Sequence, residues 1–198
     1  MGRRNSRGRN EKGSPSGRLR IVAGKWRSRL LPVTDEPGLR PTSERIRETL
    51  FNWLGSTIEG SKCLDLFAGT GALGLEALSR GAALVVFVEN SARAAAALQD
   101  SAKSLDATDA RILRQDALSY LKGEPQPFDI VFLDPPFAAD LLGVLCRLLD
   151  EGGWLADGAR VYLEQDRERA LPELPDRWTI TNDKTAGQVR YALAKVKD

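Results

Sequence analysis

The sequence predicts an α/β protein built on an open, mostly parallel sheet, and three observations support this prediction. Residues 62–81 show the pattern of a strand, a glycine-rich turn and a helix, which is the first unit of such a sheet. Farther along, apolar segments of strand length alternate with helix-forming segments. The last two apolar segments have no helix between them, which indicates an antiparallel pair at one side of the sheet.

The apolar segments also set the expected order of elements. Residues 83–88 form a nearly continuous apolar run, which is typical of a parallel strand buried on both faces. The sequence predicts seven strands, at 62–67, 83–88, 110–113, 128–133, 159–164, 178–182 and 188–196. It predicts helices at 43–54, 72–80, 91–105 and 138–149, and a hairpin-like element at 18–33. The fold class is therefore Rossmann-like α/β, with a seven-stranded sheet, helices on both faces and a small N-terminal extension.

Composition favours one soluble globular domain. The chain has 198 residues, of which 42% are hydrophobic and 28% charged. We expect a disordered basic tail at 1–17 and a single domain at 18–198, with an extension at 18–58 and a core at 59–198. No apolar run has the length of a membrane span, and no apolar stretch follows the basic N-terminus as a signal peptide requires.

Cysteine and histidine usage narrows the chemistry. Cys63 and Cys146 stand in apolar surroundings without metal-ligand spacing, so we expect buried free thiols in a reducing, cytoplasmic compartment. The chain has no histidine. The sequence therefore argues against a metal site and against a nucleophile that a histidine activates.

Positive charge is concentrated at the N-terminus. Residues 1–20 carry seven basic side chains and one acid, a net charge of +6, while the rest of the chain carries −4. Lys25, Arg27 and Arg29 add further basic groups in the expected hairpin. Such an arm suits a nucleic acid backbone, and a solubilising tail is the alternative interpretation.

The glycine-rich turn has two possible ligands. Residues 69–74 match G-x-G-x-x-G, and Glu89 follows Gly69 by twenty residues, as in dinucleotide-binding proteins. Asp65, just before the turn, would repel a pyrophosphate but attract S-adenosylmethionine, which carries a sulfonium and an ammonium group. We therefore favour S-adenosylmethionine over a nicotinamide dinucleotide or a purely structural turn. The cofactor-binding residues expected here are Asp65, Phe67, Ala68, Gly69, Thr70 and Gly71.

Three acids follow successive predicted strands: Glu89, Asp116 and Asp134. Because parallel strands end at one edge of their sheet, these acids are expected to lie together at a ligand site. In a nucleoside site, Glu89 would accept hydrogen bonds from the ribose and Asp116 from the adenine amine. Asn90 and Ala117 would lie beside them.

The segment Asp134-Pro135-Pro136-Phe137 is the predicted catalytic site. Two prolines fix the backbone and remove two amide donors, which leaves the carboxylate and the carbonyl groups as acceptors. Acceptors of this kind suit an exocyclic amino group of a base, and Phe137 offers a ring on which the base can stack. Accepting both hydrogens would favour the pyramidal nitrogen that attacks a methyl group. Alignment with the donor would supply most of the rate, so the reaction needs no metal. A proline-stiffened turn is the structural alternative.

These motifs together resemble a known family. DLFAGTG, QDA and DPPF are similar to motifs of class I S-adenosylmethionine-dependent methyltransferases that act on base amines. LRIVAGKWRSRLLPV, RPTSERIRETLFNWL and TAGQV resemble the bacterial RsmD-like family, which methylates a guanine N2 in 16S ribosomal RNA. The resemblance covers residue 18 to the C-terminus. It implies a monomeric enzyme acting on a flipped-out guanine, within the small ribosomal subunit.

The substrate site is expected on the N-terminal extension. The candidate substrate-binding residues are Arg20, Lys25, Arg27, Arg29, Arg40, Thr42 and Arg45. Two alternatives remain open at this point. One is a methyltransferase acting on adenine N6 in DNA or RNA, and the other is a non-catalytic RNA-binding factor of ribosome assembly.

Overall fold

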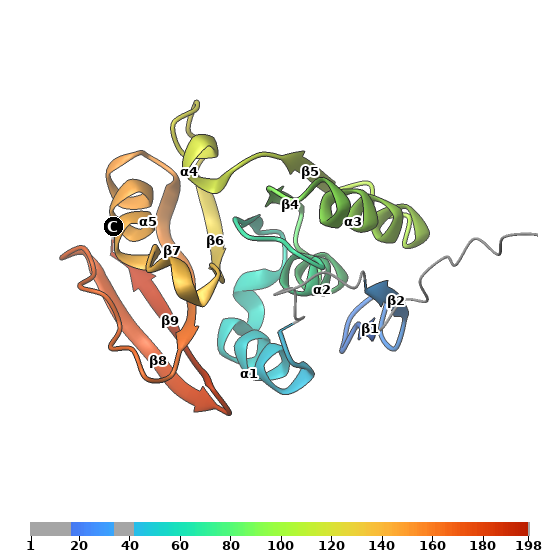
Figure 1. Cartoon of the computed structure of the whole chain (residues 1–198), viewed down its shortest axis with the longest axis horizontal. Coiled ribbons are helices and arrows are strands. Elements are labelled where there is room, and N and C mark those ends of the chain that lie inside the picture. Colours follow the sequence, from blue (N-terminus) through green and yellow to red (C-terminus); the bar gives the residue numbers. More distant parts are fainter. Residues whose placement is uncertain (1–16, 34–41, 198) are drawn as a thin grey trace, which may run out of the picture.

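The structure is a computed structural model that describes residues 17–33 and 42–197. Its centre is a seven-stranded sheet with the strand order β5-β4-β3-β6-β7-β9-β8 (Figure 1). Its strands are β3 Lys62–Asp65, β4 Leu84–Glu89, β5 Ala110–Arg114, β6 Phe128–Leu133, β7 Leu155–Asp166, β8 Trp178–Ala186 and β9 Val189–Val196. Strands β3 to β7 pair in parallel, and β9 pairs antiparallel with both β7 and β8. This arrangement agrees with the sheet that the sequence predicts.

Helices cover both faces of the sheet. They are α1 Glu44–Leu54, α2 Ala72–Ser79, α3 Ala92–Ser104, α4 Ala117–Tyr120 and α5 Leu142–Glu151, with 3₁₀ turns η1 Gly55–Ile58 and η2 Phe137–Ala139. Buried side chains of α1, α2 and α3 join one apolar cluster, and those of α4 and α5 join a second. Each cluster lies between the sheet and its own helices, as a three-layer fold requires.

A two-stranded antiparallel hairpin precedes this core. Strands β1 Gly17–Arg20 and β2 Leu30–Val33 pair with Leu19 opposite Leu31. Leu19, Leu31 and Val33 are buried against the same cluster as α1 and α2. Alternation of buried and exposed residues along both strands thus holds the hairpin on the core.

The structure differs from the predicted elements at several boundaries and in one additional helix. Strand β3 ends at Asp65 and not at residue 67, because the glycine turn starts earlier. The helix expected from residue 138 begins at Leu142, since residues 137–139 form a 3₁₀ turn and Asp140 adopts a left-handed backbone (φ 43°). Helix α4 has only four residues and was not predicted. Strands β7 and β8 are longer than expected.

Two predictions fall on residues that the structure does not describe. The basic tail lies outside the described residues up to residue 16, and Arg40 lies in the undescribed range 34–41. No helix within 17–33 or 42–197 is long and apolar enough to cross a membrane.

Candidate active site

The predicted acids meet at the carboxyl edge of the sheet. Strands β5, β4, β3 and β6 are neighbours in that order, so their ends place Asp116, Glu89, Asp65 and Asp134 along one edge. The parallel register confirms this alignment, with Asp65 opposite Phe87 on β4 and Phe132 on β6. The topology therefore brings the four carboxylates to one side of the molecule.

Asp65 lies beneath the glycine turn. Its side chain is 2% exposed, and its Oδ2 accepts a hydrogen bond of 3.0 Å from the backbone N–H of Gly74 in α2. Burial raises the pKa of Asp65 to about 7, while the Gly74 hydrogen bond opposes the shift and Asp134 and Glu89 add to it. The Gly74 hydrogen bond thus fixes the buried Asp65 carboxyl group, at the end of β3, against the first turn of α2.

Glu89 ties the turn to the end of β4. Its Oε2 accepts from Gly69 N–H at 2.7 Å, and its Oε1 accepts from Ser91 N–H at 2.7 Å. Each oxygen keeps further acceptor capacity for a ligand. The residues next to Gly69 and Glu89 differ in solvent exposure: Ala68 is buried, Phe67 and Thr70 are half-buried, and Asn90 is exposed.

Gly71 and Gly74 serve close packing around the turn. Gly71 has a left-handed backbone (φ 76°), but a Cβ there would meet Leu98 and Leu75 and not open space. Its missing side chain therefore serves packing against α3 as well as turn geometry. At Gly74 a Cβ would overlap the Phe87 ring, so this glycine lets α2 pack closely on β4.

Asp116 is the N-cap of the unpredicted helix α4. Its Oδ1 accepts from Ser119 N–H at 2.9 Å, and its side chain is exposed, while Ala117 is buried. The cap fixes the carboxylate at the sheet edge. Its second oxygen has no hydrogen bond among the described residues, so it can accept one from a ligand.

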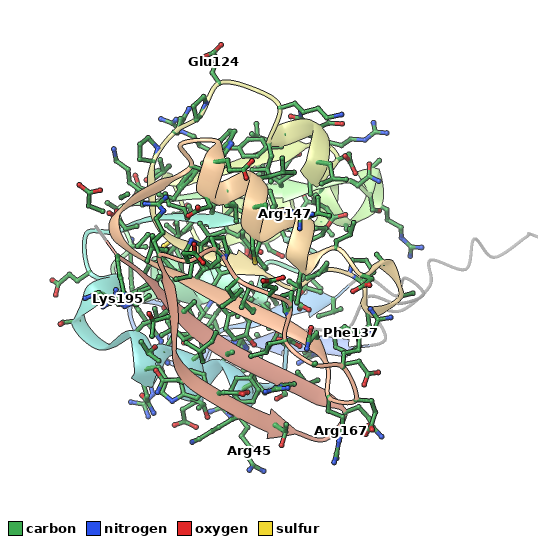
Figure 2. The ribbon with its side chains drawn as sticks, turned by 90° about the vertical axis from the view of Figure 1, so that its left-hand side faces the viewer. Arg45, Glu124, Phe137, Arg147, Arg167 and Lys195 are labelled. Carbon is green, nitrogen blue, oxygen red and sulfur yellow. The ribbon has the colours of Figure 1, made fainter. Side chains whose placement is uncertain are left out.

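The proline segment follows β6 and carries the candidate catalytic carboxylate. Asp134 is half-buried, Pro135 is buried, Pro136 is exposed, and Phe137 is half-buried at the start of η2. Figure 2 shows Phe137 and Arg45 both at the outside of the molecule. The Thr42 hydroxyl donates to Asp134 Oδ2 at 3.4 Å. Burial raises the pKa of Asp134 to about 6, and the Thr42 hydrogen bond opposes this shift.

Two further polar residues lie beside Asp134 and were not predicted. Leu133 of β6 pairs with Leu163 of β7. Asp134 and Glu164 are the next residues along the chain after this pair from two neighbouring parallel strands. Glu164 is 4% exposed and accepts from the Tyr162 hydroxyl at 2.6 Å. Burial, with Asp134 as the second cause, raises the pKa of Glu164 to about 8. The signal was present in the sequence, because Glu164 also ends an apolar strand.

The basic residues of the hairpin lie away from this edge. Lys25 N–H donates to the Ser79 carbonyl at the end of α2, and the Arg29 guanidinium donates to the Ser104 carbonyl at the end of α3. Both helices run back from the carboxyl edge, so these residues lie toward the opposite edge. Arg27 is exposed in the same turn, Arg20 is exposed on β1, and Arg45 is exposed on α1. Of the candidate substrate residues in the described ranges, Thr42 is the one that forms a hydrogen bond with Asp134.

Comparison with known proteins gives a consistent result. Residues 19–195 match the family model described as Conserved hypothetical protein 95. The chain is 49% identical over 180 residues to ribosomal RNA small subunit methyltransferase D of Escherichia coli, covering 91% of each chain. It is 45% identical over 181 residues to the Haemophilus influenzae protein of that name, covering 89% of this chain and 93% of the relative. The chain belongs to this methyltransferase family.

Solved structures agree with that assignment. The structure of putative methyltransferase yhhF from Escherichia coli has a TM-score of 0.86 at 45% identity and covers 91% of this chain and 99% of its own. SMU.776, a putative methyltransferase solved with SAH, has a TM-score of 0.68 at 18% identity and supports the fold alone. The predicted class I methyltransferase fold is confirmed, and S-adenosylmethionine stays the predicted cofactor.

The residues of this family member fit that cofactor chemically. Four acidic side chains line the edge, so a cation is favoured there and a pyrophosphate is not. No group of three or more His, Cys, Asp or Glu side chains in the described ranges is arranged to hold a metal ion. The turn, Glu89 and Asp116 offer acceptors where a nucleoside would lie.

Proposed function

We propose that this protein transfers the methyl group of S-adenosylmethionine to the exocyclic N2 amine of a guanine in 16S ribosomal RNA. The relatives at 49% and 45% identity carry names that describe small-subunit ribosomal RNA methylation. The choice of guanine N2 rests on the resemblance of the extension and of the Asp134 segment to the guanine-N2 family. The assembled small subunit is part of the same proposal.

The observation that carries the proposal is the setting of Asp134. Its carboxylate is half-buried after β6, and Thr42 engages Oδ2, which leaves Oδ1 for a substrate amine. The following prolines have no N–H and so add no donor, and the Pro135 carbonyl adds an acceptor, while the Pro136 carbonyl already accepts from Ala139 N–H. A guanine N2 amine has two N–H donors and matches this acceptor set. The same setting would hold the developing positive charge on nitrogen.

The cofactor residues have complementary roles in this proposal. S-adenosylmethionine supplies an electrophilic methyl group on a sulfonium. Asp65 would stabilise the positive end of the cofactor beneath the glycine turn, Glu89 would accept from the ribose, and Asp116 from the adenine. Phe67, Ala68, Gly69, Thr70, Gly71, Asn90 and Ala117 would form the surrounding walls.

The substrate would be bound mainly by charge and stacking. Phe137 is placed to stack on the target base next to Asp134. Exposed arginine and lysine side chains of the extension, at residues 18–58, would contact phosphates beside the core at 59–198. A monomer acting in the cytoplasm, where small subunits assemble, completes the proposal.

Radiolabelled S-adenosylmethionine tests this function directly. Small subunits purified from cells that lack the enzyme, naked 16S RNA and duplex DNA are each incubated with the protein, and the modified nucleotide is mapped. Label on a guanine N2 of the small subunit is the expected result. Label on adenine N6 would replace the proposal with the adenine alternative, and no label on any substrate would favour an assembly factor.

A further inference from the structure

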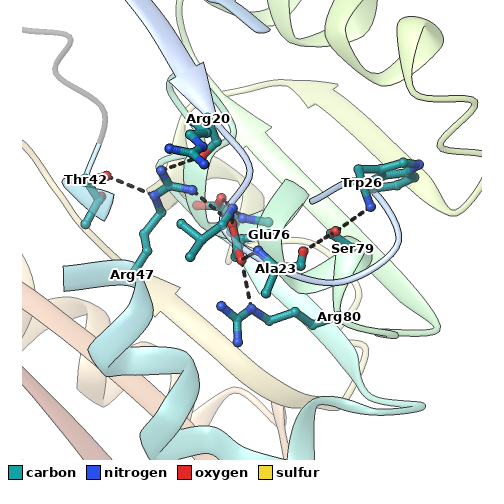
Figure 3. Close-up of polar contacts among 11 residues, drawn as sticks. Arg20, Ala23, Trp26, Thr42, Arg47, Glu76, Ser79 and Arg80 are labelled. Atoms are coloured by element: carbon teal, nitrogen blue, oxygen red, sulfur yellow. Dashed lines mark hydrogen bonds and ion pairs between the residues drawn. The ribbon is translucent and has the colours of Figure 1, made fainter. Parts of the chain in front are cut away.

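A chain of hydrogen bonds joins the N-terminal hairpin to Thr42 (Figure 3), which in turn contacts the candidate catalytic carboxylate of Asp134. It starts at the backbone of residues 20–23, passes through Glu76 and Arg47, and reaches Thr42. The Thr42 hydroxyl then donates to Asp134. These contacts link segments that lie far apart in sequence, and Thr42 and Asp134 are 92 positions apart.

Glu76 is the fixed point of this chain. It is fully buried in α2 and accepts from Val22 N–H at 2.8 Å, from Ala23 N–H at 2.9 Å and from the side chains of Arg47 and Arg80 at 3.0 and 2.8 Å. A buried carboxylate requires such partners, because transferring a charged group from water to the protein interior without hydrogen bonds or an ion pair costs free energy. The bend of the hairpin is therefore anchored to α2 through Glu76, and Ser79 adds a second anchor, since its hydroxyl accepts from Trp26 N–H and donates to the Ala23 carbonyl.

Arg47 extends the chain toward the active site. Its side chain is 1% exposed, and its guanidinium donates to Glu76 at 3.0 Å, to the Arg20 carbonyl at 2.7 Å and to the Thr42 carbonyl at 3.1 Å. A planar guanidinium can hold three acceptors in fixed directions, whereas a lysine ammonium cannot. The position of Thr42 is thus set jointly by the hairpin and α2.

Thr42 makes the final contact. It is 7% exposed, and its hydroxyl lies 3.4 Å from Asp134 Oδ2. Ser43, and not Thr42, caps α1 by accepting from Ile46 N–H. The Thr42 hydroxyl therefore has no capping role in α1 and contacts Asp134 instead.

We propose that Thr42 and Arg47 are positioning residues, which hold the Asp134 carboxylate so that its Oδ1 faces the substrate amine and which couple this orientation to the docked hairpin. The proposal rests on the proposed function of Asp134. One hydrogen bond on Oδ2 restricts rotation of the carboxylate, and Arg47 fixes the residue that makes it. The hairpin then contributes to catalysis through Asp134 without touching the reacting atoms.

The surroundings of Asp134 explain why this donor matters. The titratable groups that face it are Asp65 from β3 and Tyr162 and Glu164 from β7, and all three are acidic. Burial raises the pKa of Asp134, and the Thr42 hydrogen bond lowers it. Loss of the hydroxyl would therefore raise this pKa further and leave the carboxylate less oriented.

Thr42→Val is the decisive variant, because it keeps the shape of threonine and removes the hydroxyl. We expect single-turnover methylation of small subunits to fall about tenfold, equivalent to about 1.4 kcal/mol, with unchanged cofactor affinity by calorimetry. The midpoint of the pH–rate profile should move to higher pH. Thr42→Ser, which retains the hydroxyl, should stay within about threefold of the wild-type rate.

A second readout separates this proposal from the function itself. Carbon-13 NMR of the cofactor-free protein reports the pKa of Asp134, with Asp134→Asn used to assign its signal. Thr42→Val should raise that pKa whether or not the subunit is methylated. If wild-type protein does not methylate guanine, the proposed function fails. If Thr42→Val shows the wild-type rate and pKa, the positioning role is overturned.

Arg47→Lys tests the coupling, with Arg80→Lys as the matched control. Both arginines contact Glu76, but only Arg47 also donates to Thr42. We expect Arg47→Lys to slow methyl transfer about tenfold and Arg80→Lys to stay within about twofold. If both variants melt at similar temperatures and show equal rates, the chain contributes to stability alone and the coupling is wrong.

Discussion

At the scale of single residues, the charge of Asp134 is distinct from its role as an acceptor. Asp134→Asn keeps one acceptor oxygen and loses the negative charge that would offset the developing cation. We expect turnover to fall by ~10²–10³, because a preorganised electrostatic contact is lost. Single-turnover methylation with saturating cofactor measures this effect, and calorimetry should give unchanged cofactor affinity. A near wild-type rate would mean that an acceptor suffices without the charge.

In the proposed function, Phe137 binds the same base by stacking and not by hydrogen bonds. Phe137→Ala removes a half-buried ring beside Asp134 and leaves the carboxylate in place. Base stacking on an aromatic ring contributes about 1–3 kcal/mol, so we expect subunit affinity to fall about tenfold or more. Binding measured without cofactor isolates this step. Phe137→Tyr is the control, since its ring can still stack, and equal affinity of the alanine variant would exclude stacking on Phe137.

At the scale of elements, α2 is the junction between the hairpin, the sheet and the cofactor turn. One side of it presents Glu76 to the hairpin, and Gly74 lies against Phe87 of β4. Its first turn also supplies the N–H that reaches Asp65. A small displacement of α2 would therefore disturb stability and the cofactor site together.

Gly74→Ala tests this close packing. The added methyl group would overlap the buried Phe87 ring, so we expect a loss of about 1–3 kcal/mol in stability and weaker cofactor binding. Gly143→Ala in α5 is the matched control, because its nearest neighbour, Pro172, is at an ordinary 3.5 Å. The control should be neutral or slightly stabilising, since alanine favours helices. Denaturant unfolding compares the two, and equal stabilities would refute the packing role.

The elements also show what the sequence could predict. Strand–turn–helix order and the acids after strands are local patterns, so the core sheet and the positions of Asp65, Glu89 and Asp134 were predictable. Helix α4 has four residues, too few for a periodic signal, and its cap was interpreted only as a ligand group. The contact between Thr42 and Asp134 depends on the packing of α1 against β6. No local pattern encodes such a contact.

At the scale of the whole molecule, charge is divided between a basic N-terminus and an acidic remainder. Deleting residues 1–16 leaves β1 intact and removes five basic side chains. If these contact phosphates, subunit binding should weaken and its log–log salt slope should flatten by up to about one unit per lost contact. Cofactor affinity should not change. Filter binding from low to moderate salt measures the slope, and an unchanged slope would assign the tail a solubilising role.

The acidic edge also makes stability depend on pH. Burial raises the pKa of Asp134 to about 6, of Asp65 to about 7 and of Glu164 to about 8. Unfolding returns these carboxyl groups to ordinary values near 4, so the folded protein binds more protons between about pH 4 and 8. Stability of the cofactor-free protein should therefore fall as pH rises through this window, by up to about 1.4 kcal/mol per pH unit for each group.

Glu164→Gln isolates one part of this dependence. The amide still accepts from the Tyr162 hydroxyl but cannot ionise, so the variant should lose less stability than wild type between pH 5 and 8. Chemical unfolding at each pH gives the two curves, and parallel curves would show that Glu164 does not carry the raised pKa.

A cationic cofactor favours the ionised acids, so its affinity should increase with pH over the same range. Calorimetry in buffers of different ionisation enthalpy should then detect proton release on binding.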